Sequence, residues 1–197
     1  MAHVSVLSIL LMVACVSASA GATSVDVSPT DFVRSSCGAT RYRDLCFRCL
    51  APYAAAVRRD PRRLARAAMS VSADRARSAS AFVSQAVARA KWNGPRDAGA
   101  VRDCLENMAD SVDRLRQSAK ELDRVGRSGD RAASDFAMHM GNVRAWCSAA
   151  LTDENTCLDS LSDRCSSSVR AAVRPKVVEV AQVTSNALAL VNRLWPN

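Results

Sequence analysis

The cysteines are the residues of this sequence whose type and spacing could most readily do chemistry. The chain of 197 residues contains eight of them, and Cys46 and Cys49 form a Cys-x-x-Cys pair. A redox site built on such a pair would need a strand–helix–strand context, and a zinc site would need a second close pair. Neither is visible in the sequence, so the spacing favours disulfide bonds over catalysis or metal binding.

Acid–base chemistry has few candidates. The two histidines are His3 and His139, and His139 lies between two methionines in a helical segment. A lone histidine in that setting is more often a residue at the surface or core edge than a catalytic base. The sequence has no Gly-x-Ser-x-Gly elbow, no His-Glu-x-x-His motif and no phosphate-binding glycine loop. We therefore expect no enzymatic activity, no cofactor and no metal.

The N-terminal segment is typical of a secretory signal peptide. Val4 to Val16 is an almost unbroken apolar run, and Ala18-Ser19-Ala20 supplies the small residues that signal peptidase recognises. Cleavage before Gly21 divides the chain into a signal peptide, 1–20, and one helical domain, 21–197; a buried N-terminal helix is the alternative. The run is too short to span a bilayer, and no second run of about 20 residues follows, so no membrane span is expected.

Cleavage would remove Cys15 and leave seven of the eight cysteines. In an extracellular protein these are expected to be disulfide partners. The odd number leaves at least one thiol unpaired or bonded to another molecule. The seven are Cys37, Cys46, Cys49, Cys104, Cys147, Cys157 and Cys165.

The predicted mature chain is basic. The formal net charge is +8, and most of the excess arginine lies between Arg41 and Arg77. Outside a cell such a surface suits acidic polysaccharide, an anionic membrane or an acidic protein, and a purely solubilising role is the plain alternative. No aromatic residues are interleaved from Arg58 to Arg77, so nucleic acid is not expected as a partner.

Five helical stretches are predicted, because apolar residues recur at spacings of three and four. The first, Thr30 to Val57, is expected to be capped by Thr30, interrupted at Gly38 and bent near Pro52. The second, Asp60 to Trp92, opens with Asp60 as its cap and Pro61 in its first turn. Its apolar stripe comprises Leu64, Ala68, Val71, Phe82, Val83, Ala86 and Ala90.

The third stretch has the clearest seam and is expected to end at Gly126. Its seam comprises Val101, Leu105, Met108, Val112, Leu115, Ala119 and Leu122. The fourth runs from Arg131 to Leu151, with a separate short turn of helix expected from Thr152 to Leu161. Its apolar side comprises Phe136, Met140, Val143, Cys147 and Ala150. The fifth, Ser167 to Leu194, is expected to be kinked or delayed by Pro175.

Four long segments with one apolar stripe each and short links bury those stripes best as an up-down four-helix bundle. The broken first segment is left over, and we expect a small helical hairpin clipped by Cys37 and Cys46. The predicted fold class is therefore all-α: a disulfide-stapled up-down four-helix bundle preceded by an N-terminal helical hairpin. A rigid scaffold without catalytic groups favours recognition, as in an inhibitor or a ligand.

Two segments carry motifs of one known family. Val33 to Cys46 contains Cys-x-x-Thr-x-Tyr-x-x-x-Cys, which is similar to the opening motif of the plant invertase and pectin methylesterase inhibitor family. Trp146 to Asp159 resembles its Trp-x-Ser-Ala-Ala-Leu-Thr-x-x-x-Thr-Cys-x-Asp block, and Ser185 to Val191 is similar to its last helix. The resemblance spans about Val25 to Leu194. It implies a four-helix bundle with a helical hairpin and two disulfides, Cys37–Cys46 and Cys104–Cys157.

The second implied disulfide would join the second and third helices of the bundle. Cys49, Cys147 and Cys165 lie outside the family pattern, and an extra bridge among them stays open. Each implied disulfide is expected to contribute about 2–4 kcal/mol.

The family divides by target, and the sequence favours the esterase. Invertase inhibitors carry a Pro-Lys-Phe loop, whereas the comparable region from Gly126 to Phe136 has no such tripeptide. The resemblance therefore implies a secreted inhibitor of pectin methylesterase in the apoplast or cell wall, forming a 1:1 complex that covers the substrate cleft. The alternatives are an inhibitor of acid invertase and a basic helical antimicrobial or lipid-binding protein. Acidic pectin is a further partner expected for the basic surface.

The target is expected to bind the outward face of the third predicted helix, opposite its apolar seam. That face is the most acidic helical face in an otherwise basic chain, which suits a basic enzyme. The Cys104–Cys157 bridge would bring Thr156 beside it. The candidate target-binding residues are Asp103, Glu106, Asp110, Asp113, Arg114, Gln117 and Thr156. The plain alternative is an ordinary solvated face.

Overall fold

The computed structural model describes residues 28–89, 95–125 and 133–195. The predicted signal peptide and the expected helix end at Gly126 lie outside these residues. Within them the chain is helical and has no strand. The elements are α1 (Pro29–Cys37), α2 (Arg43–Leu50), the 3-10 turn η1 (Ala51–Tyr53), α3 (Ala54–Val57), α4 (Pro61–Arg89), α5 (Pro95–Arg124), α6 (Ala133–Arg164) and α7 (Ser167–Leu194).

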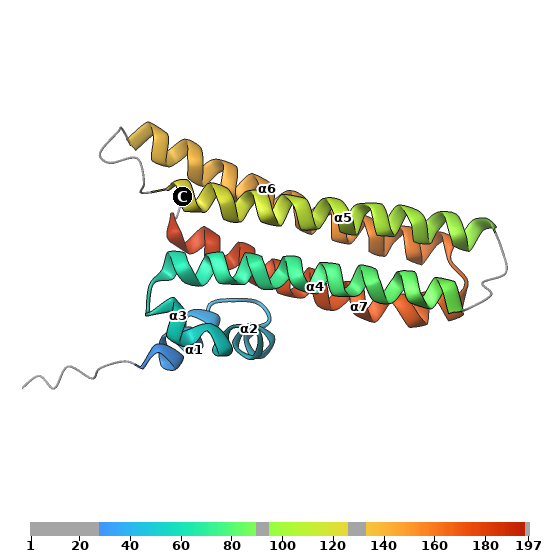
Figure 1. The fold of residues 1–197 in the computed structure, drawn as a ribbon, viewed down its shortest axis with the longest axis horizontal. Helices are drawn as coiled ribbons and strands as arrows, with labels where there is room; N and C mark the ends of the chain where they lie inside the picture. Colours follow the sequence, from blue (N-terminus) through green and yellow to red (C-terminus); the bar gives the residue numbers. More distant parts are fainter. Residues whose placement is uncertain (1–27, 90–94, 126–132, 196–197) are drawn as a thin grey trace, which may run out of the picture.

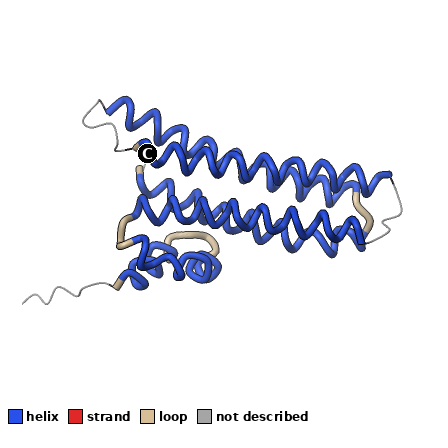
Figure 2. The backbone as a smooth tube through the Cα atoms, viewed as in Figure 1, coloured by secondary structure: helices blue, strands red, loops and turns tan. Residues whose placement is uncertain are grey.

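The four long helices form an up-down bundle (Figure 1). Each long helix packs against two others, in the order α4, α5, α6, α7 and back to α4. The short helices α1 to α3 lie together beside the end of the bundle where α4 begins (Figures 1 and 2). The predicted fold class, a four-helix bundle preceded by a helical hairpin, is confirmed.

The helix starts follow their sequence signals, with one exception. Asp60 caps α4 as expected, because its Oδ1 accepts hydrogen bonds from the backbone N–H groups of Arg62 and Arg63 at 2.8 and 3.2 Å. The prediction of Thr30 as the first cap is wrong. Ser28 caps α1, accepting from the N–H of Asp31 at 3.1 Å, because Pro29 occupies the first helical position and moves the cap one residue before it.

Two predicted interruptions are absent from the described helices. The separate turn from Thr152 to Leu161 is wrong, since α6 runs unbroken over this segment. The hydroxyls of Thr152 and Thr156 donate hydrogen bonds to the backbone carbonyls four residues earlier, at 3.2 and 2.9 Å. Such bonds are compatible with an unbroken helix. The predicted delay of α7 is also wrong, because the helix starts at Ser167 and passes through Pro175. Pro175 is exposed, so the backbone carbonyl that loses its partner there can be hydrated.

The predicted apolar stripes face the core, except for two phenylalanines. Phe82 and Phe136 were expected in the core, but their exposed fractions are 41% and 38%. On α4 the neighbouring Val83 takes the inward position, and Lys176 lies 5.5 Å from the Phe82 ring centroid. Phe136 packs edge-on against Trp195, with ring centroids 5.9 Å apart. Large aromatic rings therefore sit at the rim, while Leu, Met, Val and Ala fill the interior.

The hairpin is fixed by a covalent bond and by a side chain of the last helix. A disulfide joins Cys37 to Cys46, and the buried hydroxyl of Thr40 donates to the carbonyl of Cys37 at 2.8 Å. The side-chain amide of Asn186 on α7 accepts from the N–H of Tyr42 and donates to its carbonyl, both at 3.0 Å. The Cys-x-x-Thr-x-Tyr motif thus positions the hairpin against the bundle.

Candidate binding face

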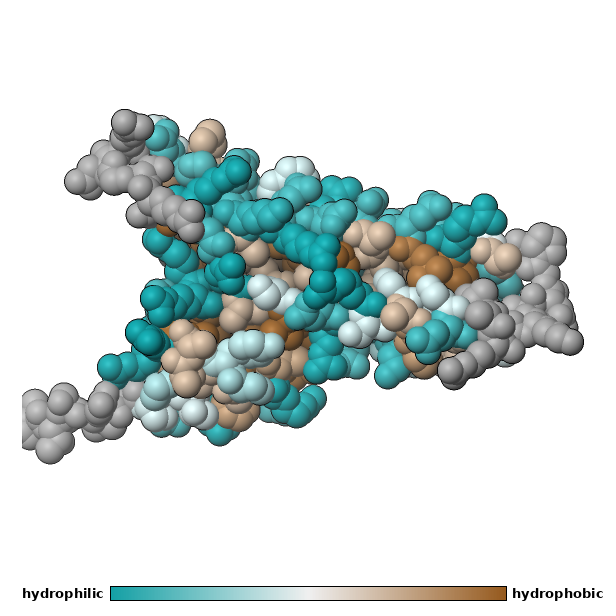
Figure 3. All heavy atoms as spheres, in the orientation of Figure 1, coloured by the Kyte–Doolittle hydropathy of each residue, from teal (hydrophilic) through white to brown (hydrophobic). Residues whose placement is uncertain are grey.

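The outward side of α5 is the first part of the candidate site. Its seam residues Val101, Met108, Leu115 and Leu122 are at most 2% exposed and face the core, so the opposite side of the same helix faces solvent. Figure 3 shows mostly hydrophilic atoms over the visible side of α5, with hydrophobic atoms along its border with α4. On this side Glu106, Asp110, Asp113 and Gln117 are exposed, and Asp103 and Arg114 are half-buried.

Helix α6 supplies the second part of the site. A disulfide joins Cys104 of α5 to Cys157 of α6, with the Cα atoms 4.1 Å apart, which is the pairing that the resemblance implies. Thr156 is exposed beside this bond. Its hydroxyl donates to the carbonyl of Thr152 at 2.9 Å, so the methyl group is the part of the side chain best placed for a partner.

An ion pair links the two helices within the face. Arg114 Nε lies 2.6 Å from Asp153 Oδ2, and the Asp153 side chain is only 13% exposed. Partial burial raises the pKa of the Asp153 carboxyl; Arg114 offsets this only in part, and the charge of Asp110 adds to the rise. Arg114 is therefore engaged within the protein, and the exposed acidic ridge of the candidate face is Glu106, Asp110 and Asp113. Asp153 was not foreseen, because its place beside Arg114 depends on the register of α6 against α5.

A buried carboxyl lies beneath this face and also was not foreseen. Glu154 is 0% exposed, and its Oε1 accepts from the hydroxyls of Ser111 at 2.6 Å and Thr184 at 2.7 Å. Thr184 also shares a hydrogen bond with the hydroxyl of Ser72. Burial raises the pKa of Glu154 to about 7, opposed by the two hydroxyl donors and assisted by the charge of Asp153. The sequence gives one indication of such a contact, which is that polar residues, Ser111 on α5 and Thr184 on α7, occupy positions that face the core.

The histidine of the described chain, His139, is paired with a carboxylate. His139 Nδ1 lies 2.6 Å from Glu121 Oε1, which also accepts from the amide of Asn142 at 3.1 Å. Burial opposes ionisation of Glu121, but these hydrogen bonds and the charge of Arg124 outweigh it and lower the pKa of the carboxyl. Among the described residues, no group of three or more His, Cys, Asp or Glu side chains could hold a metal ion.

Two cysteines outside the family pattern lie in the interior. Cys49 and Cys147 are buried thiols that form no disulfide. Burial, with a further contribution from Glu154, raises the pKa of Cys147 to about 12, so this thiol is protonated and unreactive at physiological pH. A third bridge between Cys49 and Cys147 is thus absent from the structure.

The described residues form a disulfide-stapled helical bundle with a polar outward face on α5. Residues 31–190 match the family described as plant invertase/pectin methylesterase inhibitor, and the chain belongs to this family. This agrees with the expectation that the chain is not an enzyme. Among the described residues, no helix combines the length and the apolarity needed to cross a bilayer.

The chain is similar to two named plant proteins and to one solved structure. Pectinesterase inhibitor 9 of Arabidopsis thaliana is 43% identical over 187 residues, which cover 94% of this chain and 91% of that protein. Pectinesterase inhibitor 10 of the same plant is 40% identical over 162 residues, covering 82% of this chain and 50% of that protein. The crystal structure of mutant form A of a pectin methylesterase inhibitor from Arabidopsis superposes with a TM-score of 0.58 at 18% identity, covering 79% of this chain and 92% of that chain. This last likeness supports the fold alone.

Proposed function

We propose that this protein inhibits pectin methylesterase. The observation that carries the proposal is the 43% identity to pectinesterase inhibitor 9 across nearly the full length of both chains. An invertase as target is the weaker alternative, because the relatives reported above carry the name of the esterase inhibitor. A basic antimicrobial or lipid-binding role has no support from the family.

In the proposed mechanism, the paired surface of α5 and α6 lies over the substrate cleft of the enzyme and blocks entry of pectin. The exposed acidic ridge of Glu106, Asp110 and Asp113 would meet basic side chains at the cleft, and Thr156 would lie at the edge of the contact. Charge pairing of this kind increases the association rate and fixes the orientation of the complex. One inhibitor is proposed to bind one enzyme, because a single stapled face supplies all of these contacts.

The proposed place of action is the plant cell wall, reached by secretion. The apolar run and the small-residue cleavage motif at the N-terminus support secretion. The net charge of +8 supports a second, weaker association with acidic pectin in the wall. That association would retain the inhibitor near its target without taking part in inhibition.

The decisive experiment is a titration of the purified mature protein against a pectin methylesterase and an acid invertase, side by side. We expect esterase activity to fall linearly to an end point at one inhibitor per enzyme, while the invertase keeps its activity. Loss of invertase activity alone would transfer the function to the alternative target. A complex of the inhibitor and the esterase, isolated by size-exclusion chromatography without pectin, would separate direct binding from competition for substrate.

A further inference from the structure

A groove of about 330 Å³ lies between α3 and the first turns of α4, on the hairpin side of the bundle. Its volume is at the lower end of the range for small-molecule sites, roughly 300–1,000 Å³. Tyr53 forms one wall, with an exposed fraction of 42%. Ala56 and Ala67 keep the groove wide because their side chains are small, and Ser70 adds a hydroxyl. The site combines one aromatic wall with a small number of polar groups.

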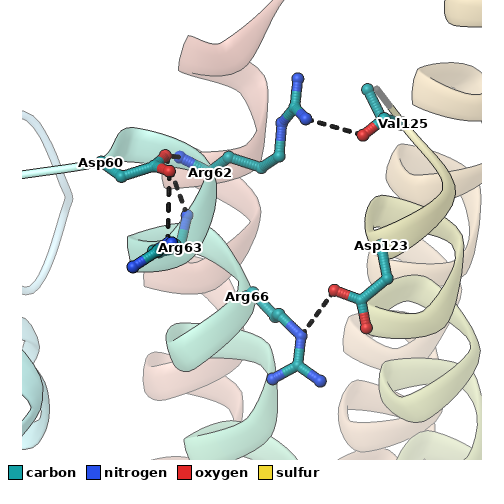
Figure 4. Close-up of polar contacts among 6 residues, drawn as sticks. All are labelled: Asp60, Arg62, Arg63, Arg66, Asp123 and Val125. Atoms are coloured by element: carbon teal, nitrogen blue, oxygen red, sulfur yellow. Dashed lines mark hydrogen bonds and ion pairs between the residues drawn. The ribbon is translucent and has the colours of Figure 1, made fainter. Parts of the chain in front are cut away.

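Two arginines line the same groove, and the Nε atom of each faces a carboxylate. Arg66 Nε lies 2.7 Å from Asp123 Oδ1 of α5, and Arg63 Nε lies 3.6 Å from Asp60 Oδ2. In Figure 4 the two terminal nitrogens of Arg66 point away from Asp123. Asp60 also accepts hydrogen bonds from the backbone N–H groups of Arg62 and Arg63 at the start of α4, so its negative charge is divided between the helix N-terminus and the Arg63 side chain. The Arg66 guanidinium is therefore oriented by its Nε atom and leaves its terminal nitrogens available to a ligand, whereas the longer Arg63–Asp60 contact is a looser ion pair between exposed side chains.

The backbone leading into the groove is strained. Arg58 and Arg59 have φ values of 52° and 61°, which place two consecutive arginines in the left-handed region. Each such residue costs about 1–2 kcal/mol relative to an ordinary conformation, and strained segments of this kind cluster at ligand-binding sites. The turn joins α3 to α4, the two helices between which the groove lies.

We propose that this groove binds a uronate unit of an acidic polysaccharide, and this proposal rests on the proposed function only for placing the protein beside pectin. A uronate ring has an apolar C–H face that suits the exposed ring of Tyr53 and a carboxylate that suits the planar fork of arginine. A polyuronate repeats that carboxylate along its chain, so neighbouring units can pair with the two arginines that line the groove, Arg63 and Arg66. A membrane is a poorer ligand, because an exposed tyrosine between arginines offers little apolar area to a bilayer.

The groove and the proposed inhibitory ridge are on different parts of the molecule. Arg66 contacts Asp123 in the last turn of α5, whereas Asp113 lies ten residues earlier on that helix. At 1.5 Å per residue this is a separation of about 15 Å along the axis. Because Asp113 also belongs to the outward side of α5, a polyuronate in the groove leaves the ridge available to the enzyme. The inhibitor would then bind wall polysaccharide and esterase at once.

The test measures binding of the full-length mature protein to polygalacturonate by affinity electrophoresis, and to short oligogalacturonides by titration calorimetry. The double variant Arg63→Gln/Arg66→Gln should weaken binding roughly tenfold or more, since it removes two charge-assisted contacts. The matched control Arg102→Gln/Arg174→Gln removes the same charge from exposed positions at the other end of the bundle, and should change binding less than about twofold. Tyr53→Ala should weaken binding without any change in net charge.

The outcomes separate a defined site from a diffuse basic surface. Equal losses in the groove variant and its control, or unchanged binding of Tyr53→Ala, would overturn the proposal. Equal affinity for fully methyl-esterified pectin, or for vesicles of phosphatidylserine, would overturn the assignment to uronate. Circular dichroism would establish that each variant is folded. Complex formation with a pectin methylesterase in the absence of pectin should be unchanged in the groove variant, and failure of the wild type to bind the enzyme would count against the proposed function alone.

Discussion

The two halves of the bundle differ in how their cores are built. The half next to the hairpin contains most of the large buried side chains, such as Leu64, Met69 and Leu115, among many Ala and Val residues, and is covered by α1 to α3. The far half is filled mainly by smaller ones, with Val101, Val173 and other valines around the Cys104–Cys157 bond. The hairpin half therefore gains stability from an added helical layer, whereas the far half, which has a thinner core and no such layer, has a covalent bond between its helices.

A polar layer separates the two apolar clusters. It contains one residue from each long helix, Ser72, Ser111, Glu154 and Thr184, joined by hydrogen bonds. These hydrogen bonds form in only one register of the four helices, so the layer favours a single arrangement over slipped ones. The two apolar halves therefore supply most of the stability, whereas the polar layer between them sets the register of the helices.

The largest expected effect comes from removing the disulfide of the far half. The double variant Cys104→Ala/Cys157→Ala opens a loop whose ends are 53 residues apart, and the chain-entropy estimate for that loop is about 4 kcal/mol. Denaturant unfolding under non-reducing conditions should show this loss in the free energy of unfolding.

The disulfide of the hairpin provides the matched comparison. Cys37→Ala/Cys46→Ala opens a loop with a separation of only nine residues, for which the same estimate is about 2.5 kcal/mol. A larger loss at the hairpin than in the far half would contradict the view that the far half depends most on its covalent bond.

A buried carboxyl in the polar layer should make stability depend on pH. The pKa of Glu154 is raised from 4.5 to about 7 in the folded state, so the folded protein binds a proton that the unfolded chain releases. Stability from this group is fully present below about pH 4.5 and is lost as the pH rises toward 7, by about 3 kcal/mol in total. Thermal unfolding measured from pH 4 to 8 should show a falling midpoint over this range.

Two variants isolate the contribution of Glu154. Glu154→Gln keeps an acceptor for Ser111 and Thr184 but cannot ionise, so the slope of stability against pH should flatten. Glu106→Gln removes an exposed carboxyl and should leave the slope as in the wild type. The charged neighbour Asp153 and the protonated thiol of Cys147 belong to the same environment. A slope that survives Glu154→Gln would assign the pH dependence to Asp153 instead.

Sequence periodicity was sufficient for the fold but not for contacts that depend on register. Six of the seven residues of the predicted α5 seam are buried and Leu105 is half-buried, because each helix must bury one stripe whatever its neighbours are. The partner of Arg114 and the ligands of Glu154 depend on how α6 slides against α5 and α7, which periodicity does not specify. Phe82 was misplaced because the small residues Ala76 and Ala79 fill the middle of α4's buried side. The periodicity of the sequence favoured the large ring of Phe82 as a core residue, whereas the core along this part of α4 accommodates small side chains.

The acidic ridge is expected to give an intermediate effect, on binding rather than on folding. Asp110→Lys/Asp113→Lys should weaken inhibition of a pectin methylesterase by about 1 kcal/mol or more, the scale of close charge pairs across an interface. Asp44→Lys/Asp74→Lys makes the same change in net charge at exposed positions on α2 and α4 and should matter less. A bulky replacement of Thr156 should also lower the affinity. Unchanged inhibition by a folded ridge variant would place the contact on another face.

The smallest expected effect concerns the strained turn at the hairpin end. Arg58 caps α3 with φ at 52°, a conformation that glycine adopts without steric cost. Arg58→Gly should therefore raise the free energy of unfolding by about 0.5–1 kcal/mol, because relief of strain exceeds the added entropy of the unfolded chain. Arg48→Gly, inside α2, should instead lower it by about 1 kcal/mol. A loss of stability in Arg58→Gly would contradict this account and would show that the arginine side chain stabilises the turn.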